Sequence, residues 1–250
     1  MDQEHIMKVY DEELGHLDQL IAEMGGLAES QLADAVEAMM RRDGDLARKV
    51  AERDTKIDAL ERDVDVLTMR VLALRQPMAE DLRTVIAALK TASDLERIGD
   101  YTRNMANRTL ALTQLRPIGG TAHTIARMGV LVQGMIKNVL DAYVGRDVEL
   151  ADDVRLRDEQ VDQLHTSLFR ELLTYMMEDP RHITTCTHLL FIAKNVERIG
   201  DHVTNIAEHV HMMVCGELPA AERPKDDRSS LTVVKSLPAG PEDQEETSDT

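Results

Sequence analysis

The stretch Glu96-Arg97-Ile98-Gly99-Asp100 decides the fold, because the same five residues return as Glu197-Arg198-Ile199-Gly200-Asp201. A second, longer block recurs in the same order: residues 38–60 match residues 142–164 at many positions, among them an Arg-Asp-x-x-x-Asp motif in each copy. Two blocks that recur in the same order indicate an internal duplication. The chain is therefore expected to contain two structurally equivalent halves.

Composition and residue spacing predict that both halves are helical. Aromatic residues make up only 2% of the chain, whereas Leu, Ala, Met, Glu and Arg, which favour helices, are frequent. Apolar residues recur at intervals of three to four. Asp43 and Asp147 are expected to cap helices, and Gly25-Gly26 is a possible interruption of the first helix. The predicted helices are 4–41, 45–74, 79–115, 121–144, 148–177 and 182–214.

The short connections between these segments determine the expected architecture. Helices joined by a few residues pack as antiparallel neighbours. We therefore predict an all-α fold of two tandem antiparallel three-helix bundles related by pseudo-twofold symmetry, over residues 1–117 and 118–216. Residues 217–250 are rich in Pro, Ser and acidic residues, a composition typical of a disordered acidic tail.

Net charge and cysteine content restrict the partners. The formal charge of −17 argues against binding to nucleic acid or directly to an anionic membrane, and it favours cations and basic protein surfaces. The chain has no apolar run long enough to span a bilayer, so a membrane would be reached only through a partner. Two cysteines and a polar, acidic start indicate a cytoplasmic protein.

Four acidic pairs carry the chemical interest of the sequence. Both acids of a pair are four residues apart and so lie on one face of a helix. A single pair of this kind is common on solvated helices. The pairs are Asp54 with Asp58, Glu96 with Asp100, Asp158 with Asp162, and Glu197 with Asp201.

The position of these pairs makes them more informative than their number. Each lies about 20 residues from the turn of its own hairpin, at Pro77 in the first half and Pro180 in the second. Two pairs should therefore come level in each antiparallel hairpin, among apolar neighbours. Four carboxylates at one height repel one another unless they are protonated, paired with cations or bound to metal. Carboxylate oxygens suit iron and hard divalent cations.

Residues near the acids are compatible with metal binding and also with neutralisation by cationic side chains. Four polar residues lie one or two turns from the acids and could support bound ions, by hydrogen bonds to the ligands or by direct binding. They are Asn104, Asn205, His165 and Glu208. The competing interpretation is a structural ion-pair network with the nearby arginines, which are Arg53, Arg97, Arg157 and Arg198. The predicted helix 182–214 also carries His202, His209 and His211, whose spacing favours a surface histidine cluster.

The ordered motifs resemble the PhoU family of bacterial phosphate-transport accessory proteins. The resemblance is carried by Arg53-Asp54-x-x-Ile57-Asp58, Arg75-Gln76-Pro77-x-x-x-Asp81 and Glu96-Arg97-Ile98-Gly99-Asp100-x-x-x-Asn104, and by the second copy of the first and third motifs. It covers about residues 5–215. Gln76-Pro77 has no counterpart in the second half.

The resemblance implies a six-helix fold, a homodimer and multinuclear clusters of iron or another divalent metal. Asp54, Asp58, Glu96 and Asp100 would hold one cluster, and the second would use the equivalent acids, Asp158, Asp162, Glu197 and Asp201. It also implies negative regulation of the phosphate-starvation response and modulation of phosphate uptake. The implied partners are the ATPase subunit of the phosphate ABC transporter and a sensor histidine kinase.

Two other functions stay open. A carboxylate-bridged metalloenzyme could be built on such a bundle, but di-iron oxidases use Glu-x-x-His pairs. Here the third residue after Glu96 is Gly99, and the third after Glu197 is Gly200. A metal-free structural adaptor, in which arginines neutralise the acids, is the other alternative. The sequence thus favours a non-enzymatic, metal-binding regulator.

Overall fold

The computed structural model describes residues 2–220, 227, 229 and 232, and side chains from Tyr10 onward. Over these residues the chain forms six long helices and no strand, which confirms the predicted all-α fold. A single turn of 3-10 helix, η1 (Pro180–His182), precedes the last of them. The helices are α1 (Asp2–Arg41), α2 (Gly44–Arg75), α3 (Glu80–Leu112), α4 (Thr121–Gly145), α5 (Val148–Glu178) and α6 (Ile183–Cys215).

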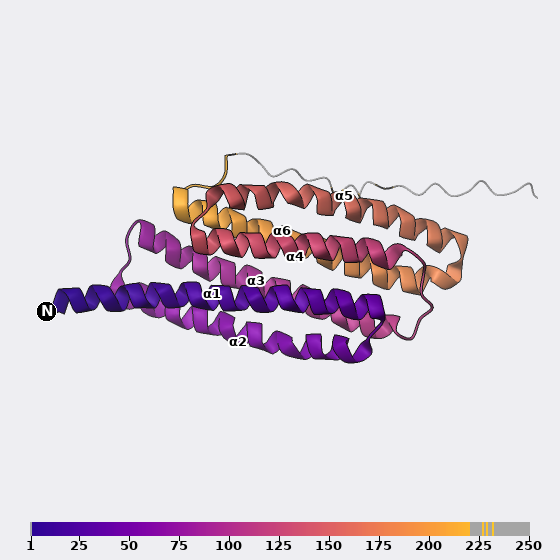
Figure 1. Ribbon diagram of the computed structural model, residues 1–250, viewed down its shortest axis with the longest axis horizontal. Helices are drawn as coiled ribbons and strands as arrows, with labels where there is room; N and C mark the ends of the chain where they lie inside the picture. The colour runs from indigo at the N-terminus through magenta and orange to yellow at the C-terminus, as the bar shows by residue number, and fades with distance from the viewer. Residues whose placement is uncertain (1, 221–226, 228, 230–231, 233–250) are drawn as a thin grey trace, which may run out of the picture.

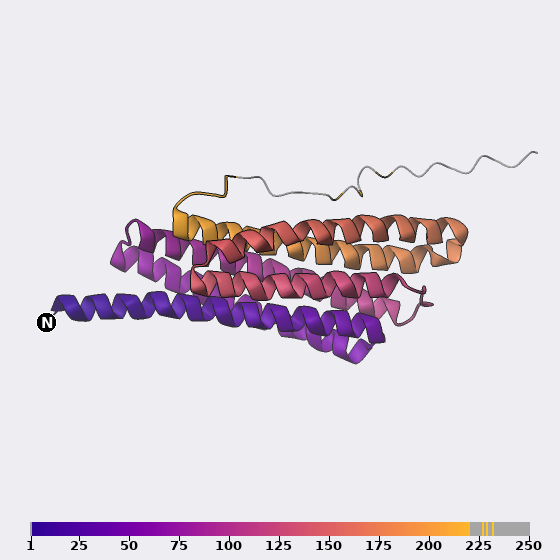
Figure 2. The same cartoon turned by 45° about the horizontal axis from the view of Figure 1, so that its top comes forward.

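The helices form two three-helix bundles that lie against each other. Helices α1, α2 and α3 pack together, as do α4, α5 and α6, and neighbours in the chain run antiparallel (Figures 1 and 2). The two bundles meet where α1 packs on α4 and α3 packs on α6. Helices α2 and α5 lie on opposite outer sides of the molecule (Figure 1). Each outer helix therefore forms a hairpin with a helix of the central α3–α6 contact.

The first helix of each bundle ends by the same device. Arg42 and Arg146 adopt the left-handed conformation, with φ of 54° in both cases. The following N–H, from Asp43 or Asp147, donates back to the carbonyl of Ala38 or Ala142 at 2.9 Å, as in a Schellman motif. Each aspartate also caps the next helix through its side chain, as expected.

The contacts of the Arg42 side chain explain why an arginine occupies this strained position in the first half. The Arg42 guanidinium donates to the carbonyl oxygens of Leu112 and Leu115 at the end of α3. The Leu112 carbonyl also accepts from the Leu115 N–H at 3.1 Å, and both carbonyls lie at the carboxyl end of α3, where a cation is favourable. The cost of the left-handed turn is thereby offset by a contact between the first and third helices of the bundle.

Glycines set the distance between α1 and α4. Helix α1 is continuous through Gly25-Gly26, so the possible interruption there does not occur. A Cβ at Gly25 would lie 2.3 Å from Leu140 Cδ2, and one at Gly129 would lie 2.6 Å from Val36 Cγ2. The glycines at these two positions allow close approach of the helices rather than a break.

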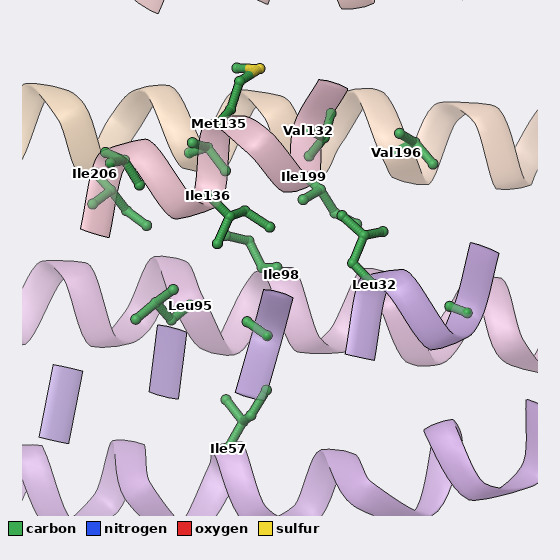
Figure 3. Packing of buried hydrophobic residues seen from close by; sticks show 14 of the residues in the cluster. Leu32, Ile57, Leu95, Ile98, Val132, Met135, Ile136, Val196, Ile199 and Ile206 are labelled. Atoms are coloured by element: carbon green, nitrogen blue, oxygen red, sulfur yellow. The ribbon is translucent and has the colours of Figure 1, made fainter. Parts of the chain in front are cut away.

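A single apolar core runs through both bundles. Ile57, Leu95 and Ile98 from the first bundle and Ile136 and Ile199 from the second belong to one buried cluster (Figure 3). Ile98 and Ile199 are the central residues of the repeated Glu-Arg-Ile-Gly-Asp motif, and both are completely buried. The acids of that motif are therefore fixed to the core by a residue two positions away.

None of the helices in the described part of the chain combines the length and apolar character that a membrane span requires. The predicted disordered tail, 217–250, falls mostly outside the described residues, which include only 217–220, 227, 229 and 232 of it.

Candidate functional site

The first acidic cluster lies between α2 and α3. Asp54 is 1% exposed, while Asp58, Glu96 and Asp100 are half-buried. The Arg103 guanidinium joins the two helices by donating to Asp54 Oδ2 and to Asp100 Oδ1. Asp54 Oδ1 is buried without a hydrogen-bond partner among the described residues.

The electrostatics show that these acids act on one another. Burial raises the pKa of Asp54, Arg103 opposes that rise, and the negative charges of Asp58 and Asp100 add to it. Burial likewise raises the pKa of Glu96, with Asp100 as the next contribution. The structure therefore brings together all four acids predicted for the first site.

The second acidic cluster lies between α5 and α6 and is more deeply buried. Asp158, Asp162 and Glu197 are all buried, and Asp201 is half-buried. Lys194 Nζ lies 2.8 Å from Glu197 Oε1. Burial raises the pKa of Glu197, and the nearby charge of Asp201 raises it further, against the opposing effect of Lys194. Lys194 comes about one turn before Glu197, whereas Arg103 comes about one turn after Asp100.

Glycine makes room for a buried carboxylate in both clusters. A Cβ added at Gly99 would lie 2.7 Å from Asp54 Oδ1, and one at Gly200 would lie 2.8 Å from Asp158 Oδ1. A real Cβ does not approach an oxygen so closely. The repeated glycine therefore lets the aspartate of the outer helix reach the backbone of the inner helix, and this explains a residue that is costly inside a helix.

The donor chemistry and the arrangement of the clusters point in different directions. Carboxylate oxygens in a buried, mutually repelling group suit a hard cation. In the described part of the chain, however, no three His, Cys, Asp or Glu side chains converge closely enough to hold one ion. In the first cluster the Arg103 guanidinium, with a side chain 37% exposed, lies between Asp54 and Asp100. The residues fit a metal in kind, and a metal would have to displace the guanidinium.

The arginines predicted to neutralise the acids mostly do something else. Arg97 contacts Asp100 at 3.2 Å, as expected. Arg53 pairs instead with Asp34, Arg157 pairs with Asp153, and Arg198 lies over the Tyr101 ring. Sequence reasoning missed two further cations in contact with the clusters, Arg103 and Lys194. Their spacing from the acids, three positions on the same helix, was the available signal.

The predicted supporting residues separate into different surroundings. Asn104 is exposed, and Asn205 donates to Asp94 at 3.2 Å rather than to an acid of the cluster. Glu208 lies 3.8 Å from Arg155 Nε. His165 is 4% exposed in its side chain and faces Asp227.

A third polar group, absent from the sequence prediction, lies between the two bundles. Asp94 of α3 faces α6, where its Oδ1 is 2.7 Å from His202 Nδ1 and its Oδ2 is 2.9 Å from His209 Nε2. Burial alone would raise the pKa of Asp94, but hydrogen bonds from these histidines and Asn205 lower it to about 2. His202 and His209 are thus half-buried contacts between the halves, not members of a surface cluster.

The fold and site define a class of protein: a duplicated helical bundle with a buried carboxylate cluster on one hairpin of each half. The family model described as the PhoU domain matches residues 21–109 and again 125–210. The chain belongs to the PhoU family, as the motifs indicated.

Similar proteins support this assignment over most of their length. A phosphate-specific transport system accessory protein PhoU homolog of Caulobacter vibrioides is 52% identical over 224 residues, which are 90% of this chain and 97% of the relative. The homolog of the same name from Rhizobium meliloti is 50% identical over 92% of this chain and 97% of its own length. These relatives are named as accessory proteins of a phosphate transport system.

Solved structures show the same fold. The crystal structure of PhoU from Pseudomonas aeruginosa is 40% identical with a TM-score of 0.80, covering 83% of this chain and 100% of that one. The phosphate transport system regulatory protein PhoU from Streptococcus pneumoniae is 29% identical with a TM-score of 0.78, covering 85% and 100%.

Proposed function

We propose that this protein is a negative regulator of the phosphate-starvation response that also modulates phosphate uptake. The observation that supports the proposal is the match to PhoU in both halves, each of which carries its own buried carboxylate cluster. The relatives are named as accessory proteins of the phosphate-specific transport system, which supports the transporter as a partner. The regulator would work in the cytoplasm as a homodimer, between the transporter ATPase subunit and a sensor histidine kinase.

Regulation is tested by deleting the gene and measuring a phosphate-starvation reporter in phosphate-rich medium. We expect the reporter to be expressed in the deletion strain and repressed again when the wild-type gene is returned. The physical basis is that a restraint on the kinase is lost with the protein. Normal repression in the deletion strain would reject the proposed role.

We also propose that the two clusters bind metal ions, and that the bound ion is iron or another divalent cation. The first site would use Asp54, Asp58, Glu96 and Asp100, and the second would use the equivalent acids Asp158, Asp162, Glu197 and Asp201. Support comes from the unpartnered Asp54 Oδ1 and from carboxylates whose repulsion a cation would relieve. A bound cation would supply positive charge that holds each hairpin closed.

Metal analysis of protein purified without chelators tests the sites. We expect stoichiometric metal in the wild type and its loss in the double variant Asp100→Ala/Asp201→Ala, because each site then lacks one ligand. Asp63→Ala/Glu149→Ala, which removes two exposed acids from the outer helices, is the matched control and should retain metal. Metal-free wild-type protein of full stability would favour the adaptor, in which Arg103 and Lys194 neutralise the clusters permanently.

A further inference from the structure

A groove on the surface of α5 and α6 lies beside the second cluster. It encloses about 260 Å³, and its residues on the two helices include His165 and Phe169 of α5 and Leu190, Phe191 and Lys194 of α6. The chain has only two phenylalanines, and both line this groove. Phe191 is 49% exposed despite its size. The groove therefore offers an apolar floor with the Lys194 ammonium at one side, and the Arg108 guanidinium lies 4.0 Å from the centroid of the Phe191 ring.

Two described residues of the C-terminal segment, Asp227 and Ser229, lie at this groove. Asp227 Oδ2 is 3.0 Å from Lys194 Nζ, and Asp227 Oδ1 is 3.4 Å from His165 Nδ1. The Ser229 N–H donates to Asp227 Oδ1 at 2.9 Å, and Ser229 itself lines the groove. Asp227, Ser229 and Thr232 are all partly buried. A segment in free solution would have no such partners.

Lys194 connects this contact to the second cluster. Its ammonium group binds Asp227 on one side and Glu197 on the other. Burial pulls the pKa of Lys194 down, but hydrogen bonds to Glu197 and Asp227 outweigh burial and leave the pKa above its ordinary value. Asp227 thus adds a carboxylate from outside the six helices to the surroundings of the second cluster, and the first cluster has no equivalent in the described residues.

We propose that residues 227–234 of this chain are the ligand of the α5–α6 groove and cover the second cluster from outside. Asp227 is the anchor on Lys194, and the apolar stretch Leu231 to Val234 supplies side chains for the groove. The proposal concerns the polypeptide alone and does not depend on metal binding.

All six helices are complete before this segment begins. They end at Cys215, and the Pseudomonas aeruginosa protein is matched over its whole length by 83% of this chain. A chain that ends at Ala220 can therefore serve as a receptor for the segment supplied as a separate peptide.

The test uses a fluorescein-labelled peptide of residues 221–236 and fluorescence polarisation, in buffer with EDTA so that metal plays no part. We expect saturable binding to the chain ending at Ala220. The affinity of the peptide for the full chain should be lower by about tenfold or more, because the protein's own segment competes at high effective concentration. An Asp227→Asn peptide should bind several-fold more weakly, whereas a Lys225→Gln peptide serves as a control for nonspecific charge effects and should bind as the wild type does.

Three results would overturn the proposal. One is the absence of peptide binding to the shortened chain while its circular dichroism shows intact helices. Another is equal binding to the shortened and full chains, which would mean that the groove is not occupied by the protein's own segment. The third is equal affinity of the Asp227→Asn and wild-type peptides, which would contradict the anchor on Lys194.

Discussion

Replacing Arg103 with Met is expected to lower the free energy of unfolding by about 2 kcal/mol at pH 7, because Asp54 then keeps a buried charge without a cation. Removal of one partner from a fully buried pair costs about 3–5 kcal/mol. The expected loss is smaller here because the Arg103 side chain is 37% exposed, so water already screens part of the pair.

This loss should depend on pH in a defined direction. Burial already raises the pKa of Asp54 above its ordinary value, and removal of Arg103 raises it further. A raised folded-state pKa penalises the folded state above that pKa and leaves no penalty below the unfolded-state pKa. The difference in stability between wild type and Arg103→Met should therefore shrink as the pH falls from 7 towards 4.

Urea unfolding followed by circular dichroism at several pH values measures this difference. Arg53→Met removes a more exposed pair, that of Arg53 with Asp34, and should cost about 0.5 kcal/mol or less at every pH. Equal losses in the two variants, or a loss for Arg103→Met that grows on acidification, would contradict the assigned role of Arg103. Recovery of the variant on addition of Mn²⁺ would separately support a cation site between Asp54 and Asp100.

Replacing Asp94 with Ala is expected to cost about 3 kcal/mol of the free energy of unfolding. Its pKa of about 2, against an ordinary 3.8, corresponds to about 2 kcal/mol. The rest comes from His202, His209 and Asn205, whose polar atoms lose a shared acceptor between the bundles, at about 1 kcal/mol.

The Asp94 contribution has the opposite pH dependence from that of Asp54. A lowered folded-state pKa gives stability that is present above the unfolded-state value and is lost as the pH falls through the folded-state value. The wild type should therefore lose about 2 kcal/mol more than Asp94→Ala between pH 5 and pH 2, a figure that follows from the same pKa shift. Asp141→Ala, which breaks an exposed pair with Lys137, is the control and should change little. Parallel acid-unfolding curves for wild type and Asp94→Ala would rule the assignment out.

Local sequence signals predicted the helices and their order correctly. Asp43 and Asp147 cap helices as expected, since a cap depends only on neighbouring residues. The level placement of the acidic pairs followed from counting residues from the two turns, because an antiparallel hairpin converts sequence distance into height. Identity as a PhoU protein rested on the same residues.

Tertiary contacts explain what the sequence could not predict. Gly25 sits in an unbroken helix because it packs on Leu140, a residue far away in the chain. Arg103 could not be distinguished from other exposed arginines until the position of Asp54 was known. Asp94 escaped notice because the duplication provides no guide to it: the residue that corresponds to it in the second half is Asn195.

The contact between α3 and α6 has a consequence for the order of folding. Asp94 and His202 are 108 positions apart, whereas only residues 76–79 separate α2 from α3. Closing a longer loop costs more chain entropy, so the hairpins are expected to form before the halves dock. Contacts made after the rate-limiting step act mainly on the unfolding rate. The protein is thus expected to fold like a pair of subunits that meet late, with residues 113–120 keeping the second half near the first.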